Sequence, residues 1–225
     1  MKGYGQFCPT AKAAEILAER WTLLVLRELL LGSHRYGDIQ RGVPRMSPTL
    51  LAKRLKQLEQ AGVVARLRKG GGSVEYHLTD AGRDLEPMMG NLAEWGYRWI
   101  NRTLSRDDLD PAFLMWAIRR NLVIKALPPA RSVIYVEFTD GRPPRRWWLV
   151  VADGEADLCI KDPGHEIDLF VRADVLTLTR FFECRISLAE AKSSEHMKLH
   201  GSTVLIRTIK QWFGRPATKW VGDPA

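Results

Sequence analysis

The spacing of apolar residues in SPTLLAKRLKQLEQAG, residues 47–62, predicts an amphipathic helix. At about 100° per residue, three leucines fall on one face: Leu51, Leu55 and Leu58. Ser47 is a favourable N-cap and Pro48 suits the first helical position. Gly62 suits the left-handed position that ends such a helix. The opposite face is polar and basic, and its role depends on the elements around it.

Shorter helical segments precede this helix. Residues 11–18 have the pattern of a short helix, and residues 21–32 are apolar nearly all round, which predicts a buried helix. Another short helix opens at residues 36–39, with Gly37 as its expected cap. The segment RGVPRM is a tight turn that ends just before Ser47. Short helices, a turn and an amphipathic helix in this order predict a helix-turn-helix.

After Gly62 the hydrophobic period changes from helical to alternating. Residues 63–69 and 74–78 each alternate like a strand, and GGGS joins them, so we expect a β-hairpin. Thr79 then caps another helical stretch, with a bend expected near Pro87. A hairpin directly after the amphipathic helix of residues 47–62 predicts a winged helix-turn-helix.

Charge supports a polyanion partner for this fold. The chain of 225 residues has a net charge of +8, and residues 35–69 contain nine basic residues against Asp38 and Glu59. In a winged helix-turn-helix the third helix offers its polar face to the DNA major groove, and the wing reaches phosphates or the minor groove. The candidate DNA-binding residues are Arg35, Ser47, Thr49, Lys53, Arg54, Lys56, Gln57, Arg66, Arg68 and Lys69. For any single residue, a solvated helix face is the alternative.

The segment LEPMMGNLAEWGYRWINRTL predicts a long helix with a continuous apolar stripe. The stripe consists of Leu85, Met88, Met89, Leu92, Trp95 and Trp99. A small winged-helix core cannot cover all of it, so we expect a homodimer interface, which also fits a palindromic DNA site. Packing against the second half of the chain is the alternative.

A polar connector at residues 104–111 divides the chain into expected domains at 1–104 and 112–225. The second half has a helix at residues 112–127, strand-like runs in SVIYVEF, RRWWLVVA and EIDLFVRA, a helix in DVLTLTRFFEC, a short strand in MKLHG and a terminal helix in STVLIRTIKQWF. This order predicts an α+β fold, with an antiparallel sheet covered by helices.

Residues 7–100 resemble the HxlR-type bacterial transcriptional regulators from end to end. The resemblance rests on the early Cys-Pro, on WTLLVLREL, on SPTLLAKRLKQLEQAG and on the wing followed by YHLTDAGRDLEP. It implies a dimeric winged-helix protein that binds double-stranded DNA and regulates a neighbouring operon. Gly37 departs from the family, which usually has Ser there, and Gly is the weaker cap. Some HxlR-type proteins sense oxidants or electrophiles through a cysteine at the place of Cys8, for which a small packing residue is the alternative reading.

Residues 112–215 resemble the sterol carrier protein type 2-like fold in their order of elements. That resemblance implies an apolar tunnel between sheet and helices, and hence an apolar small-molecule effector. The candidate pocket residues are Trp116, Trp148, Phe170, Leu178, Phe181, Phe182, Ile206 and Trp212. Ordinary core packing is the alternative for each of them.

Other chemistry has little support in the sequence. No GxSxG, HExxH, phosphate-binding or dinucleotide-binding motif is present, so we expect no enzyme activity and no cofactor. His196 and His200 alone make a poor metal site. Three unpaired cysteines, no signal peptide and no membrane-spanning run predict a cytoplasmic protein without a membrane partner. The rival classes are a lipid carrier with a vestigial DNA-binding half and a redox-sensing regulator.

Overall fold

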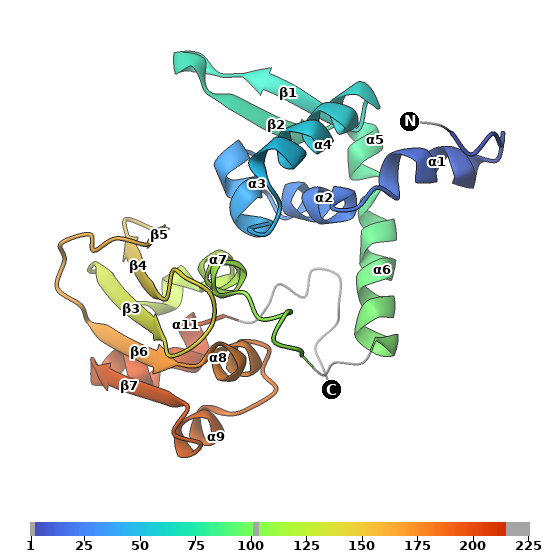
Figure 1. The fold of residues 1–225 in the computed structure, drawn as a ribbon. Helices are drawn as coiled ribbons and strands as arrows, with labels where there is room; N and C mark the ends of the chain where they lie inside the picture. Colours follow the sequence, from blue (N-terminus) through green and yellow to red (C-terminus); the bar gives the residue numbers. More distant parts are fainter. Residues whose placement is uncertain (1–2, 101–103, 215–225) are drawn as a thin grey trace. The chain divides into compact units, whose positions relative to one another are not determined.

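The computed structural model describes residues 3–100 and 104–214. These residues form two compact units, one on each side of the gap (Figure 1). Each unit has its own hydrophobic core.

The first unit begins with the predicted helices. They are α1 (Pro9–Leu17), α2 (Thr22–Leu30), α3 (Tyr36–Gly42) and α4 (Pro48–Gln60). Ser47 caps α4 as predicted, since its Oγ accepts a hydrogen bond from the Leu50 amide at 3.3 Å. Gly62 takes the left-handed φ of 72° after the last turn. The predicted cap of α3 is wrong: the N-cap is Arg35, whose extended backbone bridges to Glu75 of the wing.

The predicted wing is present in this unit. Strands β1 (Val64–Arg68) and β2 (Val74–Leu78) pair antiparallel, with Arg66 opposite Tyr76, and they project beyond the helices (Figure 1). Gly71 and Gly72 have φ of 75° and 80°, a region that residues with a Cβ rarely adopt. The glycine run therefore makes the tight connection between the two strands.

A broken helix follows the wing. Thr79 caps α5 (Asp80–Arg83) by accepting a hydrogen bond from the Gly82 amide at 3.2 Å. The chain then bends at residues 84–85 and continues as α6 (Glu86–Trp99), with Pro87 in the first turn. The expected bend thus lies just before Pro87, because a proline is tolerated only in the first turn of the helix that follows it.

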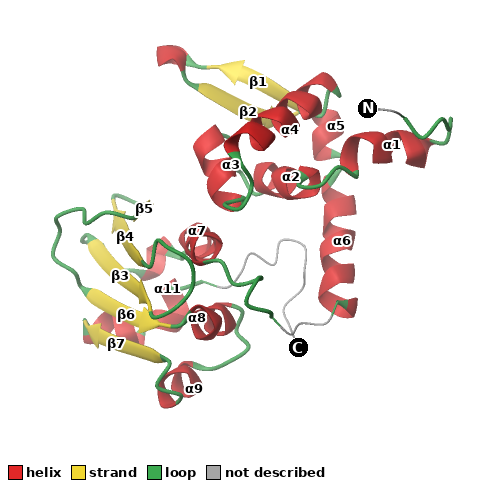
Figure 2. Cartoon of the chain, viewed as in Figure 1, coloured by secondary structure: helices red, strands yellow, loops and turns green. Residues whose placement is uncertain are grey.

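The second unit contains a sheet of five strands. Figure 2 shows these strands in yellow, with the helices in red. In spatial order its strands are β5 (Glu155–Cys159), β4 (Arg146–Ala152), β3 (Ser132–Phe138), β6 (Leu169–Ala173) and β7 (Met197–Gly201). Its helices are α7 (Pro111–Asn121), α8 (Val175–Phe182), α9 (Leu188–Ser193), α10 (Thr203–Arg207) and α11 (Ile209–Trp212), with a 3₁₀ turn η2 (Ile124–Ala126) after α7. The α+β class is as predicted.

Several predicted details of this unit are wrong. The sheet is mixed, because β6 lies parallel to β3 after the chain has completed the β4–β5 hairpin. The helix predicted to reach residue 127 ends at Asn121, since the Val123 amide pairs with the Trp212 carbonyl instead. The terminal helix breaks at Thr208, whose hydroxyl donates to the Val204 carbonyl. Strand β5 and helix α9 were not predicted.

The residues predicted to line a pocket in the second unit do not all lie around one space. Leu149 and Leu169 face the helices, so Trp148 and Phe170, which stand next to them in their strands, point to the other face of the sheet. There both rings flank Tyr135, at centroid distances of 5.0 and 5.8 Å. Leu178, Phe181, Phe182, Ile206 and Trp212 do belong to the helix-side core. Trp116 instead packs its ring against the guanidinium groups of Arg119 and Arg120.

In the described parts of the chain, no helix is long and apolar enough to cross a membrane.

Candidate nucleic-acid interface

Helix α4 is held on its apolar side and presents its polar side to solvent. Leu51, Leu55 and Leu58 are at most 1% exposed and belong to the core of the first unit. The turn before the helix is fixed by side chains of α3. The Tyr36 hydroxyl donates to the Pro48 carbonyl, and the Gln40 amide donates to the Met46 carbonyl, both at 2.8 Å. This is the helix-turn-helix geometry that the sequence predicts.

Most of the predicted residues of α4 lie on the exposed face. Ser47, Thr49, Lys53 and Lys56 are exposed, and Gln57 is half-buried. The DNA major groove, about 12 Å wide, admits an α-helix that presents a polar face of this kind.

Arg54 is the exception among these residues. It is only 7% exposed, and its guanidinium donates three hydrogen bonds within the fold. They reach the Glu19 carboxylate at 2.6 Å, the Arg20 carbonyl at 3.1 Å and the Gln57 side chain at 2.6 Å. We therefore exclude Arg54 from the candidate DNA-contacting set. It ties α4 to the α1–α2 connection, a role that sequence analysis missed because Glu19 is 35 residues away and carries no local signal.

The wing adds a second basic surface. Arg66 and Arg68 are exposed on one side of β1 and make no ion pair within the described residues. Lys69 lies 3.9 Å from the Glu75 carboxylate. A hydrogen bond from His77 lowers the pKa of Glu75, and the nearby charges of Lys69 and Arg35 act in the same direction. Glu75 is therefore anionic at neutral pH and offsets part of the charge of Lys69, so the charge of the wing is concentrated on Arg66 and Arg68.

The apolar stripe of α6 divides into two sets. Met89 is only 6% exposed, and Leu85 is half-buried against the core of the first unit, so both are removed from the predicted dimer surface. The other four residues are exposed, namely Met88, Leu92, Trp95 and Trp99. Their 4-3-4 spacing is that of one seam along a helix. We call these four residues the α6 seam.

Cys8 stands at the N-cap position of α1 and is exposed. The backbone amides of Ala11 and Thr10, at the start of the helix, lower the pKa of its thiol. A lowered pKa raises the fraction of thiolate, which is the form that reacts with oxidants and electrophiles.

Comparison with known proteins identifies the first unit. The family described as HxlR-like helix-turn-helix matches residues 16–104. YvaP of Bacillus subtilis (strain 168), named an uncharacterized HTH-type transcriptional regulator, is 38% identical over 112 residues, which are 48% of this chain and 95% of YvaP. The similarly named sll1512 of Synechocystis sp. is 34% identical over 100 residues, or 44% of this chain and 74% of that protein.

Among solved structures, the reduced form of the transcriptional regulator YodB from B. subtilis is 30% identical, with a TM-score of 0.38, and the match covers 43% of this chain and 97% of YodB. YvaP and sll1512 are named as transcriptional regulators, and this class of protein is not enzymatic. The chain belongs to the HxlR-like helix-turn-helix family.

Proposed function

We propose that this protein is a regulator that binds its operator, a specific double-stranded DNA site, as a homodimer. Helix α4 enters the major groove, and the wing contacts the flanking backbone or minor groove. The observation that carries the proposal is the division of α4. Its leucines and Arg54 are committed to the fold, which leaves Thr49, Lys53 and Lys56 exposed on one rigid face.

The proposal is tested by titrating the intact protein into a labelled duplex from upstream of its own gene, and into a scrambled duplex of equal composition. We expect the upstream duplex to bind at least a thousandfold more tightly at physiological salt. Equal affinity for the two duplexes would favour the rival carrier protein, in which the DNA-binding half is vestigial.

On the wing, Arg68→Ala should weaken binding to every duplex to a similar degree. A phosphate contact carries no sequence information, and its loss should lower the slope of log affinity against log salt by about one unit. Arg207→Ala is the control, since it removes the same charge from an exposed position in the second unit. The measurement is fluorescence anisotropy at four salt concentrations. An unchanged slope for Arg68→Ala would remove this arginine from the interface.

We infer that the dimer forms through the α6 seam. Its two tryptophans are 54% and 68% exposed, which is a costly amount of apolar surface for a helix to leave in water. A two-fold axis at this seam would place two copies of α4 on one duplex, as palindromic sites require.

For the second unit we infer a sterol carrier protein type 2-like module that takes an apolar ligand or assists assembly. Strand β7 ends at Gly201 and leads directly into α10, which is the order of elements on which the resemblance rests. The Phe213 ring packs against Phe181 at 5.2 Å and Trp212 at 5.7 Å, so a ligand has to displace it. Thermal-shift assays with fatty acids test this role. If no fatty acid changes the melting temperature, assistance in assembly is the role that remains for the second unit.

Cys8 carries a second candidate function, redox sensing. Mild peroxide or a quinone should change the affinity of the wild type for its operator, and Cys8→Ser should abolish the response, because only the thiolate reacts. Cys184→Ser is the control, since Cys184 is also an exposed free cysteine. A response that Cys8→Ser retains in full would leave Cys8 as a packing residue.

A further inference from the structure

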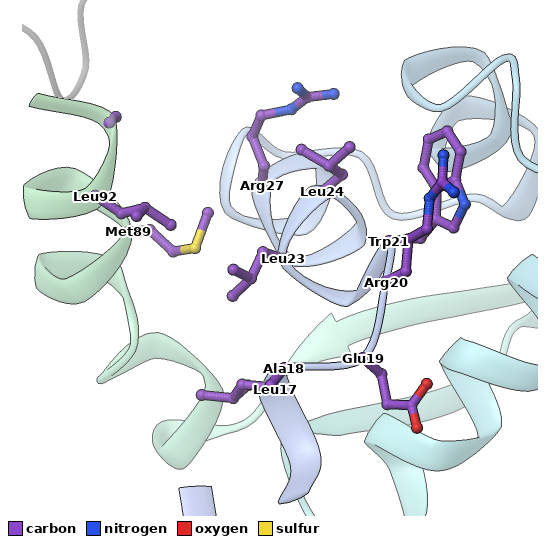
Figure 3. Close-up of a pocket in the computed structure, with 11 residues that line it drawn as sticks. Leu17, Ala18, Glu19, Arg20, Trp21, Leu23, Leu24, Arg27, Met89 and Leu92 are labelled. Carbon is purple, nitrogen blue, oxygen red and sulfur yellow. The ribbon is translucent and has the colours of Figure 1, made fainter. Parts of the chain in front are cut away.

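The first unit contains a cavity of about 440 Å³ that the helix-turn-helix does not use. It lies among the end of α1, the α1–α2 connection, α2 and α6 (Figure 3). Its lining includes Leu17, Leu23, Leu24, Met89, Leu92 and Ala93. We call it the α2–α6 cavity. Both its volume and its apolar walls are those of small-molecule sites.

The charged side chains at the edge of the cavity differ in whether another side chain balances their charge. Glu19, Arg20 and Arg27 lie there. The Glu19 carboxylate is paired with Arg54, and Arg27 donates to the Glu28 carboxylate and the Gly42 carbonyl. The Arg20 guanidinium lies 5.6 Å from the centre of the Trp21 ring and makes no ion pair within the described residues. The edge therefore offers one cation whose charge no carboxylate balances, next to an aromatic ring.

The same edge is connected to α4. Arg54, between Lys53 and the buried Leu55, bonds both the Glu19 side chain and the Arg20 carbonyl. The next residue, Trp21, has φ of 79°, a conformation that costs free energy for a bulky side chain. A ligand that moves residues 19–21 can therefore relieve the strain at Trp21 and disturb the bonds that hold α4.

We propose that the α2–α6 cavity binds a small aromatic carboxylate, with the ring between α2 and α6 and the carboxylate at Arg20. Occupancy weakens DNA binding by displacing Glu19 and Arg20 from Arg54. This regulatory half rests on the proposed DNA-binding function. The ligand acts only if it binds the free protein more tightly than the DNA-bound protein, and DNA must then weaken ligand binding by the same factor.

The first experiment uses no DNA. Isothermal titration of the intact protein compares 2-naphthoate with its uncharged analogue 2-naphthamide. We expect 2-naphthoate to bind more tightly, and Arg20→Gln to weaken its binding about tenfold while leaving 2-naphthamide unchanged. Ala93→Phe, which fills the cavity, should abolish binding of both compounds. Phe181→Ala, in the core of the second unit, is the control and should change neither.

Three results would overturn the site. They are no binding of either compound to the wild type, full binding by Ala93→Phe, or loss of binding in Phe181→Ala. Leu92 belongs both to the cavity wall and to the α6 seam. A dissociation constant that rises with protein concentration would therefore also overturn the site, because the dimer contact at the seam would then cover the cavity.

The second experiment measures coupling. Saturating 2-naphthoate should weaken operator binding about tenfold in the wild type. Glu19→Gln keeps a hydrogen-bond acceptor for Arg54 but removes the charge, so it should still bind 2-naphthoate and show a smaller effect on DNA. Equal operator affinity with and without bound 2-naphthoate would overturn the regulatory half. Because operator affinity without the probe is measured separately, failure of the DNA-binding function itself is seen independently.

Discussion

We expect Trp95→Glu to convert the protein into monomers and to weaken operator binding at least a hundredfold. Trp95 lies in the middle of the α6 seam and is 54% exposed in the single chain, so a dimer through the seam would bury it. An unpaired carboxylate buried in such a contact costs about 3 kcal/mol or more, which is over a hundredfold in the dimer dissociation constant. Sedimentation velocity at several concentrations measures the assembly, and a duplex titration measures the affinity.

Two variants serve as controls for this substitution. Trp95→Phe keeps an aromatic side chain in the seam and should remain dimeric. Val204→Glu makes the same kind of change, apolar to acidic, at a position 57% exposed on α10 of the second unit. If Trp95→Glu stays a dimer and Val204→Glu does not, the interface lies on the second unit.

The second large effect separates two neighbours on α4. Arg54→Ala should lower the free energy of unfolding of the first unit by about 2–3 kcal/mol, because Glu19, Arg20 and Gln57 lose their shared partner. Lys53→Ala should leave this free energy nearly unchanged, since Lys53 is exposed. It should instead weaken operator binding by about 1–3 kcal/mol if the side chain reads a base edge, and Thr49→Ala should behave similarly.

Hydrogen exchange with denaturant, followed on peptides of the first unit, measures stability there without interference from the second unit. Duplex titration measures affinity at a temperature at which both variants are folded. If Arg54→Ala is as stable as the wild type, its hydrogen bonds do not hold α4. If Lys53→Ala and Thr49→Ala both bind like the wild type, a different face of the protein meets DNA.

The first unit could be predicted from sequence because its signals are local. Ser47 and Pro48 start α4, Gly62 ends it, and the run of glycines turns the wing, each through backbone geometry that neighbouring residues determine. Because these signals fix where α4 begins and ends, they also allowed most of its exposed residues to be predicted.

Other features depend on partners far along the chain, and sequence patterns did not reveal them. Helical spacing placed Arg54 near the polar face, but its long side chain turns inward to Glu19. Apolar character alone could not say that Trp148 and Phe170 lie on the opposite face of the sheet from Leu178, because strand register decides this. The parallel pairing of β3 with β6 likewise follows from the path of the chain between them.

The apolar stripe of α6 is another feature that sequence pattern alone could not resolve, although its residues are close together in the chain. Leu85 and Met89 are also four residues apart, but Leu85 packs on the core of the first unit and Met89 is buried. Met88 and Leu92, on the adjacent side of the helix, are exposed. Periodicity identified an apolar helix, whereas the fold determined which apolar residues remain for a partner.

The central claim, sequence-specific recognition of duplex DNA by α4, is tested most directly by selection from a library of random duplexes with the intact protein. The account predicts enrichment of an inverted repeat whose half-site centres are about 10 base pairs, or a multiple of that, apart. The double variant Thr49→Ala, Lys53→Ala should lose this enrichment while still retaining DNA weakly through charge. The absence of any enriched sequence with the wild type, or the same enriched sequence with the double variant, would contradict it.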